Sequence, residues 1–379
     1  MSLSLYIHFP FCTNICSYCD FFKVPYDEPL EKTYFDALEA ELLLIKDTID
    51  PELRKLETIY IGGGTPSLIN LSLLEHFLDR LRKFFEMPGE MEFSFEINPE
   101  SIDSDRLAVI KELGVNRPIF GIQSFNVGLL TLLNRKHNLN DSFRAVYLAR
   151  ALGFDNFGID MIFGLPKQTV RNLSDDLNQL VDLAPPHVSY YQLTVEKNTP
   201  LDTKIKDGTL QVPDSDLSAA MYRAINEELK GHGCFRYEIS SYALPGYECK
   251  HNLRYWEGGD FLGLGPAAHS FIGNRRFANT SDLKLYLDSL SEHRRPLIFD
   301  ADNEDSRIIE TIMLGLRTTR GIARRAFQNR FGIPLEKVMD MASLKAMREA
   351  NLIDSDEDSL KLSESGFLVA DEIIRRLVK

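Results

Sequence analysis

The sequence predicts a mixed α/β fold, in which a partial (β/α)6 barrel is followed by an α+β region and a C-terminal winged-helix-like domain. Short apolar segments alternate with amphipathic segments from residue 3 to about residue 195, which is the pattern of strands and covering helices. From residue 304 onwards the pattern indicates three helices, a two-stranded ribbon and a last helix. At roughly 150 residues per domain, a chain of 379 residues holds two or three such units.

The first region contains six strand and helix units. The expected strands are residues 3–9, 58–61, 92–97, 118–122, 156–163 and 187–193, and the expected helices are residues 34–49, 71–85, 103–113, 141–152 and 169–183. Apolar side chains recur every three or four positions, as at Leu74, Phe77, Leu78 and Leu81. Strands that alternate with helices pair in parallel through right-handed crossovers. Six units are too few to close an eight-stranded barrel, so we expect an open one.

The second half departs from this alternation. We expect a helix at 214–230, a strand at 236–243, a glycine- and aromatic-rich stretch without helix signals at 249–270, a ribbon at 353–362 and a helix at 367–378. An acidic turn at 354–358 lies within the ribbon. These patterns divide the chain into a barrel at 1–235, a connecting region at 236–300 and a winged-helix-like domain at 301–379.

Composition places the protein in a broad class. Hydrophobic residues make up 44% and charged residues 26% of the chain, which is an ordinary globular balance and excludes a mostly disordered protein. No apolar run approaches the roughly 18 residues of a membrane span. The first residues have no basic start and no small-residue cleavage site. We therefore expect no signal peptide and a cytoplasmic location.

Charge argues against a nucleic-acid partner. The 43 basic and 56 acidic residues leave a net charge of −13, which disfavours non-specific binding to nucleic acid or anionic membranes. Segment 304–379 is neutral, with 13 basic and 13 acidic residues. It nevertheless contains a basic patch without carboxylates between residues 311 and 335, made of Arg317, Arg320, Arg324, Arg325 and Arg330. A solvated helix face is the simpler interpretation of this patch, and contact with a partner is the alternative.

Residues capable of chemistry follow the ends of the expected strands. They are a cysteine loop after the first strand and the segments 62–66, 98–100, 123–124 and 164–166 after the second to fifth strands. In a parallel barrel the carboxyl ends of the strands meet on one rim. We therefore expect five separate segments to converge on a single functional site.

Three of the five cysteines lie within eight residues, at Cys12, Cys16 and Cys19. An odd number of cysteines in a long chain argues against a disulfide framework and favours a metal or cluster site. Three thiolates on one tight loop suit three irons of a [4Fe–4S] cluster and leave the fourth iron open to another ligand. The alternative is a zinc site with His8 as a fourth ligand. Aromatic residues such as Phe21 are expected to form an apolar shell around the loop.

The cysteine spacing Cys-x-x-x-Cys-x-x-Cys, with Tyr18 before the third cysteine, resembles the radical S-adenosylmethionine (SAM) superfamily. The resemblance implies that the amino and carboxylate groups of SAM bind the open iron. It also implies that an electron from the cluster can cleave the SAM sulfonium, so an electron donor is an expected partner. The cofactors carry this chemistry, and the protein binds and orients them.

The same resemblance implies a SAM site on the rim. The glycine run at 62–64 is similar to the motif that meets the SAM amino group, since glycines let a backbone approach a ligand closely. Asp160 is expected to accept from ribose hydroxyls, and Arg135 is expected to face the SAM carboxylate. The segment 117–120 departs from the family by lacking its usual serine. The full set of expected SAM-binding residues is Tyr6, Gly63, Gly64, Thr65, Glu96, Gln123, Arg135 and Asp160.

A resemblance to the oxygen-independent coproporphyrinogen III oxidase family extends over nearly the whole chain and is carried by YIHFPFC, IGGGTPS, FGIQSF, DMIFGLP and LGLGPAAHS. The dehydrogenases of this family have a fourth cysteine where this sequence has Phe21, and an N-terminal extension that is missing here. The motif H-N-x-x-Y-W, at residues 251–256, instead fits the HemW-type haem chaperones. We therefore predict a haem chaperone, and the alternative is oxidative decarboxylation of coproporphyrinogen III to protoporphyrinogen IX.

Haem is the expected cargo, with residues of this motif in its pocket. A neutral imidazole is a common axial ligand, so His251 is the expected iron ligand, while Tyr255 and Trp256 are expected to stack on the porphyrin. Cys249 is a rival ligand, and so is His269, which we expect to pack against the barrel instead. The resemblance implies haem-accepting proteins as partners, such as membrane-associated respiratory enzymes, implies no nucleic-acid partner and leaves room for a homodimer.

Overall fold

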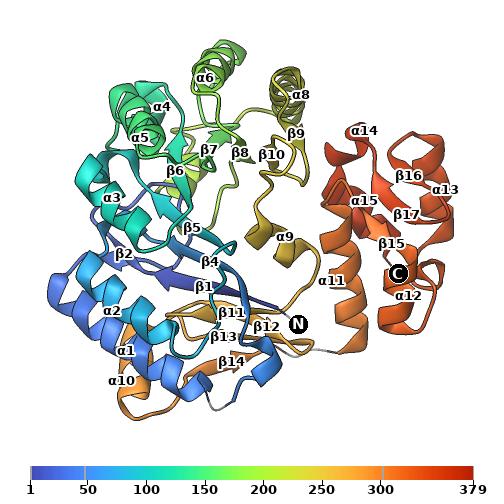
Figure 1. Cartoon of the computed structure of the whole chain (residues 1–379). Coiled ribbons are helices and arrows are strands. Elements are labelled where there is room, and N and C mark those ends of the chain that lie inside the picture. The colour runs from blue at the N-terminus through green and yellow to red at the C-terminus, as the bar shows by residue number, and fades with distance from the viewer. Residues whose placement is uncertain (1, 47, 301–302, 379) are drawn as a thin grey trace.

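The computed structural model describes residues 2–46, 48–300 and 303–378, and one large sheet organises most of them (Figure 1). The sheet order is β14-β13-β12-β11-β1-β4-β5-β6-β7-β8-β10-β9. Its centre consists of the six expected parallel strands, which are β1 (Leu3–Phe9), β4 (Leu56–Gly63), β5 (Glu92–Ile97), β6 (Arg117–Gln123), β7 (Gly158–Phe163) and β8 (His187–Gln192). The predicted partial barrel is thus confirmed.

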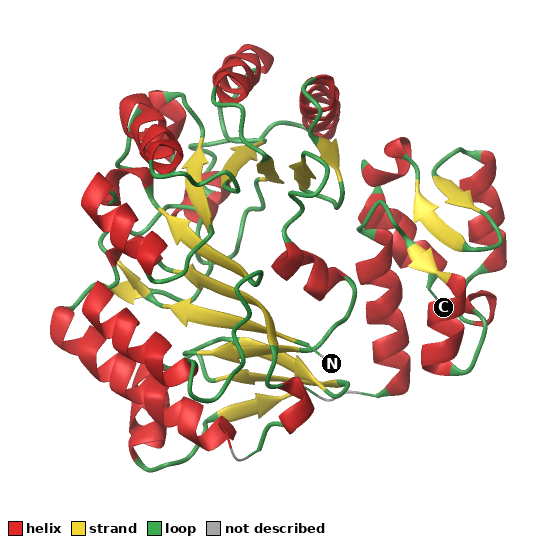
Figure 2. Cartoon of the chain, viewed as in Figure 1, coloured by secondary structure: helices red, strands yellow, loops and turns green. Residues whose placement is uncertain are grey.

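Helices cover the outer face of the curved sheet, as Figure 2 shows. They are α1 (Glu28–Lys46), α2 (Leu71–Leu81), α3 (Ser104–Glu112), α5 (Leu139–Ala151), α6 (Val170–Asp182) and α8 (Ser215–Gly231). The short helices α4 (Val127–Leu132) and α7 (Pro200–Lys206) instead contact the cysteine loop at Ser17. The strands are apolar throughout because helices or barrel interior cover both faces, and β1 buries six of its seven residues. Helix α1 begins at Glu28, earlier than the expected residue 34, because Asp27 Oδ1 accepts from Leu30 N at 2.9 Å and caps the first turn.

The connecting region extends the same sheet at both edges. On one side lie β10 (Ser241–Ala243) and β9 (Phe235–Arg236), which divide the expected strand 236–243 into two. On the other side β11 (Phe261–Leu264) pairs in parallel with β1 and is followed by antiparallel β12 (His269–Ile272), β13 (Arg275–Asn279) and β14 (Leu297–Phe299). The helices of this region are α9 (Lys250–Trp256) and α10 (Leu283–Ser291). The expectation that 249–270 lacks a helix was therefore wrong.

The C-terminal domain has its own core and the expected winged-helix-like arrangement. A small sheet in the order β15-β17-β16 packs with helices, and Ile312, Leu316, Leu360 and Leu377 are fully buried between them. The elements are α11 (Glu304–Leu316), β15 (Ile322–Ala323), α12 (Arg324–Phe331), α13 (Met341–Glu349), β16 (Ile353–Ser355), β17 (Ser359–Leu362), α14 (Glu364–Phe367) and α15 (Ala370–Leu377). The division of the chain at residues 235 and 300 stays a prediction.

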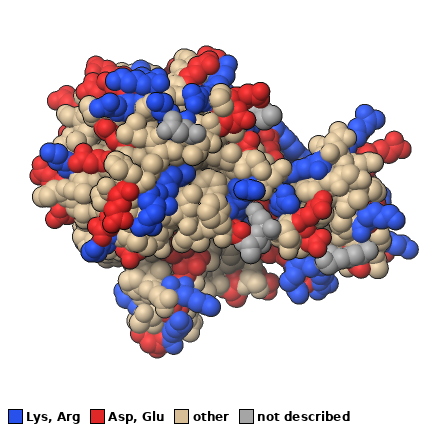
Figure 3. Space-filling model, turned by 90° about the horizontal axis from the view of Figure 1, so that it is seen from below, with Lys and Arg blue, Asp and Glu red and all other residues tan. Residues whose placement is uncertain are grey.

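The basic patch of this domain is not a free cationic surface. Four of its five arginines contact side chains from other segments, in the pairs Arg317–Asp371, Arg320–Glu257, Arg324–Glu336 and Arg330–Asn274. Figure 3 shows a face of the molecule on which acidic and basic side chains are interspersed. Within the described ranges, no helix combines the length and the hydropathy that crossing a bilayer requires.

Candidate functional site

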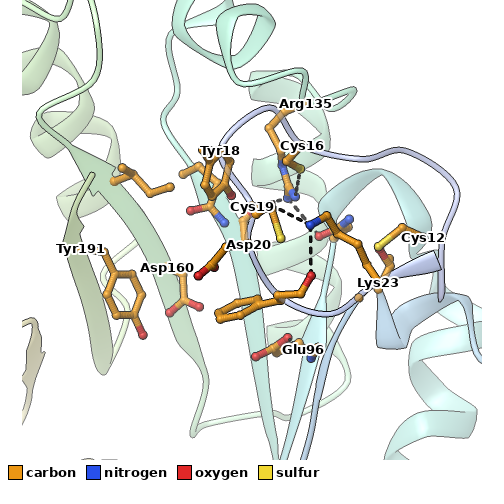
Figure 4. Close-up of a pocket in the computed structure, with 18 of the residues that line it drawn as sticks. Cys12, Cys16, Tyr18, Cys19, Asp20, Lys23, Glu96, Arg135, Asp160 and Tyr191 are labelled. Carbon is orange, nitrogen blue, oxygen red and sulfur yellow. Dashed lines mark hydrogen bonds between the residues drawn. The ribbon is translucent and has the colours of Figure 1, made fainter. Parts of the chain in front are cut away.

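A cavity of about 370 Å³ lies at the carboxyl ends of the barrel strands, beside the cysteine loop (Figure 4). This volume is in the range of roughly 300–1,000 Å³ that small-molecule sites occupy. The residues around it include Cys12, Cys16, Cys19, Gly63, Gly64, Thr65, Glu96, Gln123, Arg135 and Asp160. The structure thus brings together every predicted cluster and SAM residue except Tyr6.

The cysteine loop connects β2 (Phe11–Cys12) with β3 (Val24–Pro25), and backbone hydrogen bonds close its base. Lys23, which sequence analysis did not single out, donates from Nζ to Cys19 O at 2.7 Å and to Phe21 O at 3.0 Å. Phe21 is 63% exposed and lines the cavity, so it lies beside the cysteines as expected but does not exclude water from them. Its carbonyl oxygen accepts from Lys23 Nζ. A single lysine four positions after the last cysteine was the available sequence signal.

The sulfur atoms of the loop are positioned by residues of other segments. The Thr65 hydroxyl donates to Cys12 Sγ at 3.5 Å, and Arg135 Nη1 donates to Cys16 Sγ at 3.6 Å. Burial raises the pKa of the Cys12 and Cys19 thiols. Three sulfur donors on one loop that opens into a polar cavity fit an iron–sulfur cluster, because each thiolate binds a different iron.

The zinc alternative finds no support in this arrangement. Both ring nitrogens of His8 are engaged, since Nδ1 lies 3.0 Å from Tyr6 Oη and Nε2 lies 2.8 Å from Phe22 O. Among the residues that the structure describes, no three His, Cys, Asp or Glu side chains are grouped closely enough to hold a single metal ion. His8 instead connects β1 with the cysteine loop.

The glycine run brings backbone close to the cavity, as its composition predicts. Gly63 has a φ of +113°, and a Cβ there would lie 2.7 Å from the His8 ring and 2.9 Å from Phe9 O. Only glycine fits such a position. The Gly63 amide donates to Glu96 Oε2 at 3.2 Å, and the Tyr60 hydroxyl donates to Glu96 Oε1 at 2.9 Å.

Two half-buried carboxylates face the cavity, Glu96 from β5 and Asp160 from β7 (Figure 4). Burial and the neighbouring Asp160 raise the pKa of Glu96 to about 7. Burial raises the pKa of Asp160 to about 6. Two carboxylates so placed favour protonation or a positively charged ligand. This wall of the cavity is therefore suited to a cation.

Arg135 places a permanent positive charge on another wall. Its Nη2 donates to Asn98 Oδ1 at 3.0 Å and to Gly121 O at 2.5 Å, which fixes the guanidinium. Its Nε is buried and has no hydrogen-bond partner in the described part of the chain. A buried donor without a partner is unfavourable, so the position fits a ligand carboxylate. Opposite charges on two walls match a zwitterionic ligand.

Tyr6 lies deeper in the barrel than the cavity. Its hydroxyl bonds with His8 Nδ1 at 3.0 Å, and its ring centroid lies 6.2 Å from that of Tyr60 and 6.5 Å from that of His251. Tyr6 does not line the cavity. Its contact with SAM stays a prediction, whereas its contacts with three neighbouring rings are structural facts.

The motif 251–256 forms α9 at the amino-terminal end of the barrel, on the side away from the cavity (Figure 1). Glu92, the first residue of β5, accepts from Lys250 N at 3.0 Å, from His251 N at 3.1 Å and from Cys249 Sγ at 3.4 Å. A carboxylate at a helix N-terminus satisfies its free amides and interacts favourably with its dipole. The helix forms because a residue far away in the sequence caps it.

His251 is 1% exposed, and both of its ring nitrogens are engaged. Nδ1 lies 2.6 Å from Thr58 Oγ1, and Nε2 lies 2.7 Å from Tyr255 Oη. Because the Thr58 hydroxyl donates to Ser4 Oγ, its oxygen accepts from Nδ1–H, and the Tyr255 hydroxyl then donates to Nε2. Burial lowers the pKa of His251 to about 3. The ring is thus a neutral imidazole whose free lone pair is occupied by Tyr255.

The other residues considered for haem differ in accessibility. Trp256 is half-buried at the end of α9, and the Tyr255 ring packs edge-to-face on Phe261 with a centroid distance of 4.6 Å. Cys249 is 1% exposed. His269 is exposed, so the expectation that it packs against the barrel was wrong. His251 and its rival Cys249 are therefore enclosed, Trp256 is partly accessible, and His269 is open to solvent.

Comparison with known proteins agrees with this site. The radical SAM superfamily matches residues 6–180, and the HemN C-terminal domain matches residues 303–369. A solved structure described as coproporphyrinogen III oxidase (HemN) from Escherichia coli, a radical SAM enzyme, superimposes with a TM-score of 0.85 at 26% identity, over 99% of this chain and 89% of that one. The fold and the cysteine cavity therefore define a radical SAM protein, the class that uses a [4Fe–4S] cluster and SAM.

Curated relatives narrow the class further. Heme chaperone HemW of Bacillus subtilis is 35% identical over 98% of this chain and 97% of its own length. Heme chaperone HemW of Haemophilus influenzae is 34% identical over 98% of this chain and 97% of its own length. The chain belongs to the HemW family.

Proposed function

We propose that this protein is a haem chaperone that holds a [4Fe–4S] cluster and SAM in the rim cavity and haem at α9. The observation that carries the proposal is the presence in one barrel of a cysteine cavity at one end and a neutral histidine beside two large aromatics at the other. Relatives that match the full length of the chain bear the name heme chaperone, which supports haem as the cargo.

In the cavity, Cys12, Cys16 and Cys19 would hold three irons, and the bound cluster and SAM would supply one-electron chemistry. The protein would orient SAM through opposite charges. Arg135, whose Nε lacks a partner among the described residues, would pair with the SAM carboxylate. Glu96 would face the cationic part of SAM, and Asp160 would accept from its ribose hydroxyls. Gly63, Gly64, Thr65 and Gln123 would complete the wall.

At α9, His251 Nε2 would ligate the haem iron after the Tyr255 hydroxyl leaves it. Trp256, half-buried at the end of the helix, would contact the porphyrin face. The recipients would be haem-requiring proteins, including membrane-associated respiratory enzymes. We further propose that the protein receives electrons from a separate donor protein, works in the cytoplasm and forms a homodimer.

The test is anaerobic reconstitution followed by haem titration of the wild type and of His251→Ala, Cys249→Ala and His269→Ala. We expect the Soret band to shift and the affinity to fall in His251→Ala alone, because an axial ligand controls both. A wild-type spectrum and affinity in His251→Ala would place the iron elsewhere, and a change confined to Cys249→Ala would indicate a thiolate ligand.

Fluorescence provides an independent readout of the same proposal. Trp256 is the single tryptophan of the chain, so haem bound at α9 is expected to quench most of the tryptophan emission. Unquenched emission at saturation would place haem far from the motif, whichever residue holds the iron.

The second candidate is coproporphyrinogen III dehydrogenase, which the structural match to the Escherichia coli enzyme favours. Phe21 argues against it, because this residue stands where the dehydrogenases have a fourth cysteine, and its side chain is 63% exposed beside the cavity. We expect no protoporphyrinogen from coproporphyrinogen under reducing, anaerobic conditions with SAM. Product formation over repeated turnovers would support the enzyme instead.

A further inference from the structure

We propose that a layer of three rings, formed by Tyr6, Tyr60 and His251, makes haem binding at α9 and SAM binding in the rim cavity mutually antagonistic. We call these residues the ring layer. The inference rests on the proposed function, because it concerns the communication between its two sites. It assigns Tyr60 and Tyr6 as positioning residues that act through the loops they support.

The ring layer occupies the barrel interior between the two sites. The Tyr60 and His251 centroids are 5.1 Å apart, and the Tyr6 centroid is 6.2 Å from Tyr60 and 6.5 Å from His251. Each ring thus contacts the other two. Packing at this density transmits a displacement, because an interior without voids cannot absorb the movement of one ring.

From this layer, Tyr60 leads to the SAM loop. Its hydroxyl donates to Glu96 Oε1 at 2.9 Å, and the other carboxylate oxygen accepts from Gly63 N at 3.2 Å. A Cβ on Gly62 would lie 2.8 Å from Glu96 Oε1 and 2.9 Å from the Tyr60 ring, so these groups have no room to shift independently. Tyr60, Glu96 and Gly63 all line the cavity, and the Tyr60 hydroxyl fixes the carboxylate that faces the ligand.

Tyr6 leads to the cysteine loop by a second branch. Its hydroxyl bonds with His8 Nδ1 at 3.0 Å, and His8 Nε2 bonds with Phe22 O at 2.8 Å. Phe22 follows the third cysteine by three residues. The ring layer therefore supports both the glycine run that would bind SAM and the cysteine loop that would bind the cluster.

His251 Nε2 cannot bind the haem iron and the Tyr255 hydroxyl at the same time. His251 Nε2 accepts from the Tyr255 hydroxyl, and Nδ1 is bonded to Thr58, so the ring cannot bind iron without losing a hydrogen bond. Because His251 is 1% exposed, its ring must shift to meet an iron that arrives from outside, and a shifted ring loses its packing against Tyr60. The molecule thus has two arrangements, one with a complete ring layer and one with His251 on iron.

The sign of the coupling follows from which arrangement each ligand favours. SAM would bind to Glu96 and Gly63 as the complete layer positions them, whereas haem would bind only after the layer is disturbed. A ligand shifts an equilibrium by its difference in affinity for the two states. Each ligand should therefore weaken the other, and by the same factor, because binding coupling is reciprocal.

The experiment measures that factor with the cluster-loaded, full-length protein. Haem affinity is measured by Soret titration with and without saturating SAM, and SAM affinity by equilibrium dialysis with and without haem. We expect each ligand to weaken the other by about fivefold or more, the lower end of typical allosteric coupling. In Tyr60→Phe, which keeps the ring and removes the bond to Glu96, the factor should fall towards one while both ligands still bind.

Tyr190→Phe is the matched control, because Tyr190 is a buried barrel tyrosine whose hydroxyl has no partner among the described residues. It should keep the wild-type coupling factor. Tyr6→Phe is a second variant, which removes the hydrogen bond to His8. Haem should change the spectrum of the reduced cluster in the wild type and should leave it unchanged in Tyr6→Phe.

The outcomes separate this inference from the proposed function. If the wild type binds no haem or no SAM, both fail together. If it binds both ligands with a coupling factor of one, or binds haem more tightly with SAM, only the inference is overturned. Wild-type coupling in both Tyr60→Phe and Tyr6→Phe would also overturn it, because the ring layer would then not carry the effect.

Discussion

The two ends of the barrel are built in opposite ways. At the carboxyl end, an open cavity contains carboxylates with raised pKa values, an arginine Nε without a partner and a glycine at φ +113°. At the amino end, α9 is closed, and the polar atoms of His251 and Glu92 are engaged. The cavity is preorganised for a ligand, whereas α9 must rearrange to accept one. The affinity for a ligand should therefore depend on direct contacts in the cavity, and at α9 it should depend on the free energy needed to displace the enclosing side chains.

The largest expected effect tests the cavity end. Cys16→Ser should abolish the intact [4Fe–4S] cluster, because a second iron would lose its protein ligand. Iron content and the spectrum of the reduced cluster after anaerobic reconstitution measure the loss. Cys234→Ser is the control, since Cys234 is buried, does not line the cavity and donates from Sγ to Pro185 O at 3.7 Å. A full cluster in Cys16→Ser would contradict the assignment.

A smaller change at the same end tests preorganisation. Gly63→Ala should weaken SAM binding by about tenfold or more, because its Cβ would meet the His8 ring and Phe9 O below 3.0 Å at a positive φ. Gly114→Ala has a similar φ of +105°, and the atom nearest to its new Cβ, Phe93 Cδ1, is 3.9 Å away, at ordinary contact distance. This control variant measures how much a strained backbone alone changes SAM affinity. Equal SAM affinity in the two variants would show that the close approach at Gly63 is unimportant.

The closed end is tested by removing the cap of α9. Glu92→Gln should lower the free energy of unfolding by about 1–3 kcal/mol, because an amide cannot accept from both Lys250 N and His251 N as the carboxylate does. Denaturant unfolding measures the change. Glu112→Gln removes the same charge from an exposed helix position and should change stability little. If the two variants were equally stable, α9 would not depend on its remote cap.

The smallest expected effect is a pH dependence at the cavity end. Burial raises the pKa of Glu96 from 4.5 to about 7, so the folded protein holds this proton more tightly than the unfolded chain does. The contribution to stability is therefore present below about pH 4.5 and is lost as the pH rises through about 7. Glu96→Gln should stabilise the ligand-free protein by about 1–3 kcal/mol at pH 8 and by much less at pH 5. Unfolding curves at both pH values measure this, and an equal difference at both would contradict it.

Patterns within short stretches of sequence were sufficient to predict the segments that form the cavity. The cysteine spacing and the glycine run are each contained within eight residues, and each follows a strand whose apolar run is visible in the sequence. Parallel strands place their carboxyl ends on one rim, so convergence of these segments could be predicted without a structure. The depth of Tyr6 in the barrel could not be predicted in this way, because it depends on the register Tyr6–Tyr60, three residues before the strand end.

The closed end could not be predicted in the same way. The helix α9 has seven residues, and its cap is Glu92, which is 159 positions away from His251. The strands β11 to β14 are short, and β11 is completed by pairing with β1 at the start of the chain. Intrinsic propensity is weak in such short elements, so tertiary contacts decide their structure.

The sequence by itself determined the class of fold and the cluster loop, because these depend on periodicity and on residues close together in the chain. The charged walls of the cavity come from Glu96, Arg135 and Asp160, which are far apart in the chain and meet because successive parallel strands end on one rim. The tertiary structure alone decided that His251 is enclosed, that Tyr255 holds its Nε2 and that a layer of rings separates it from the SAM loop. Those features join segments near residues 6, 60, 92 and 251. Burial and hydrogen bonding across such separations follow from packing in three dimensions, which a linear pattern does not encode.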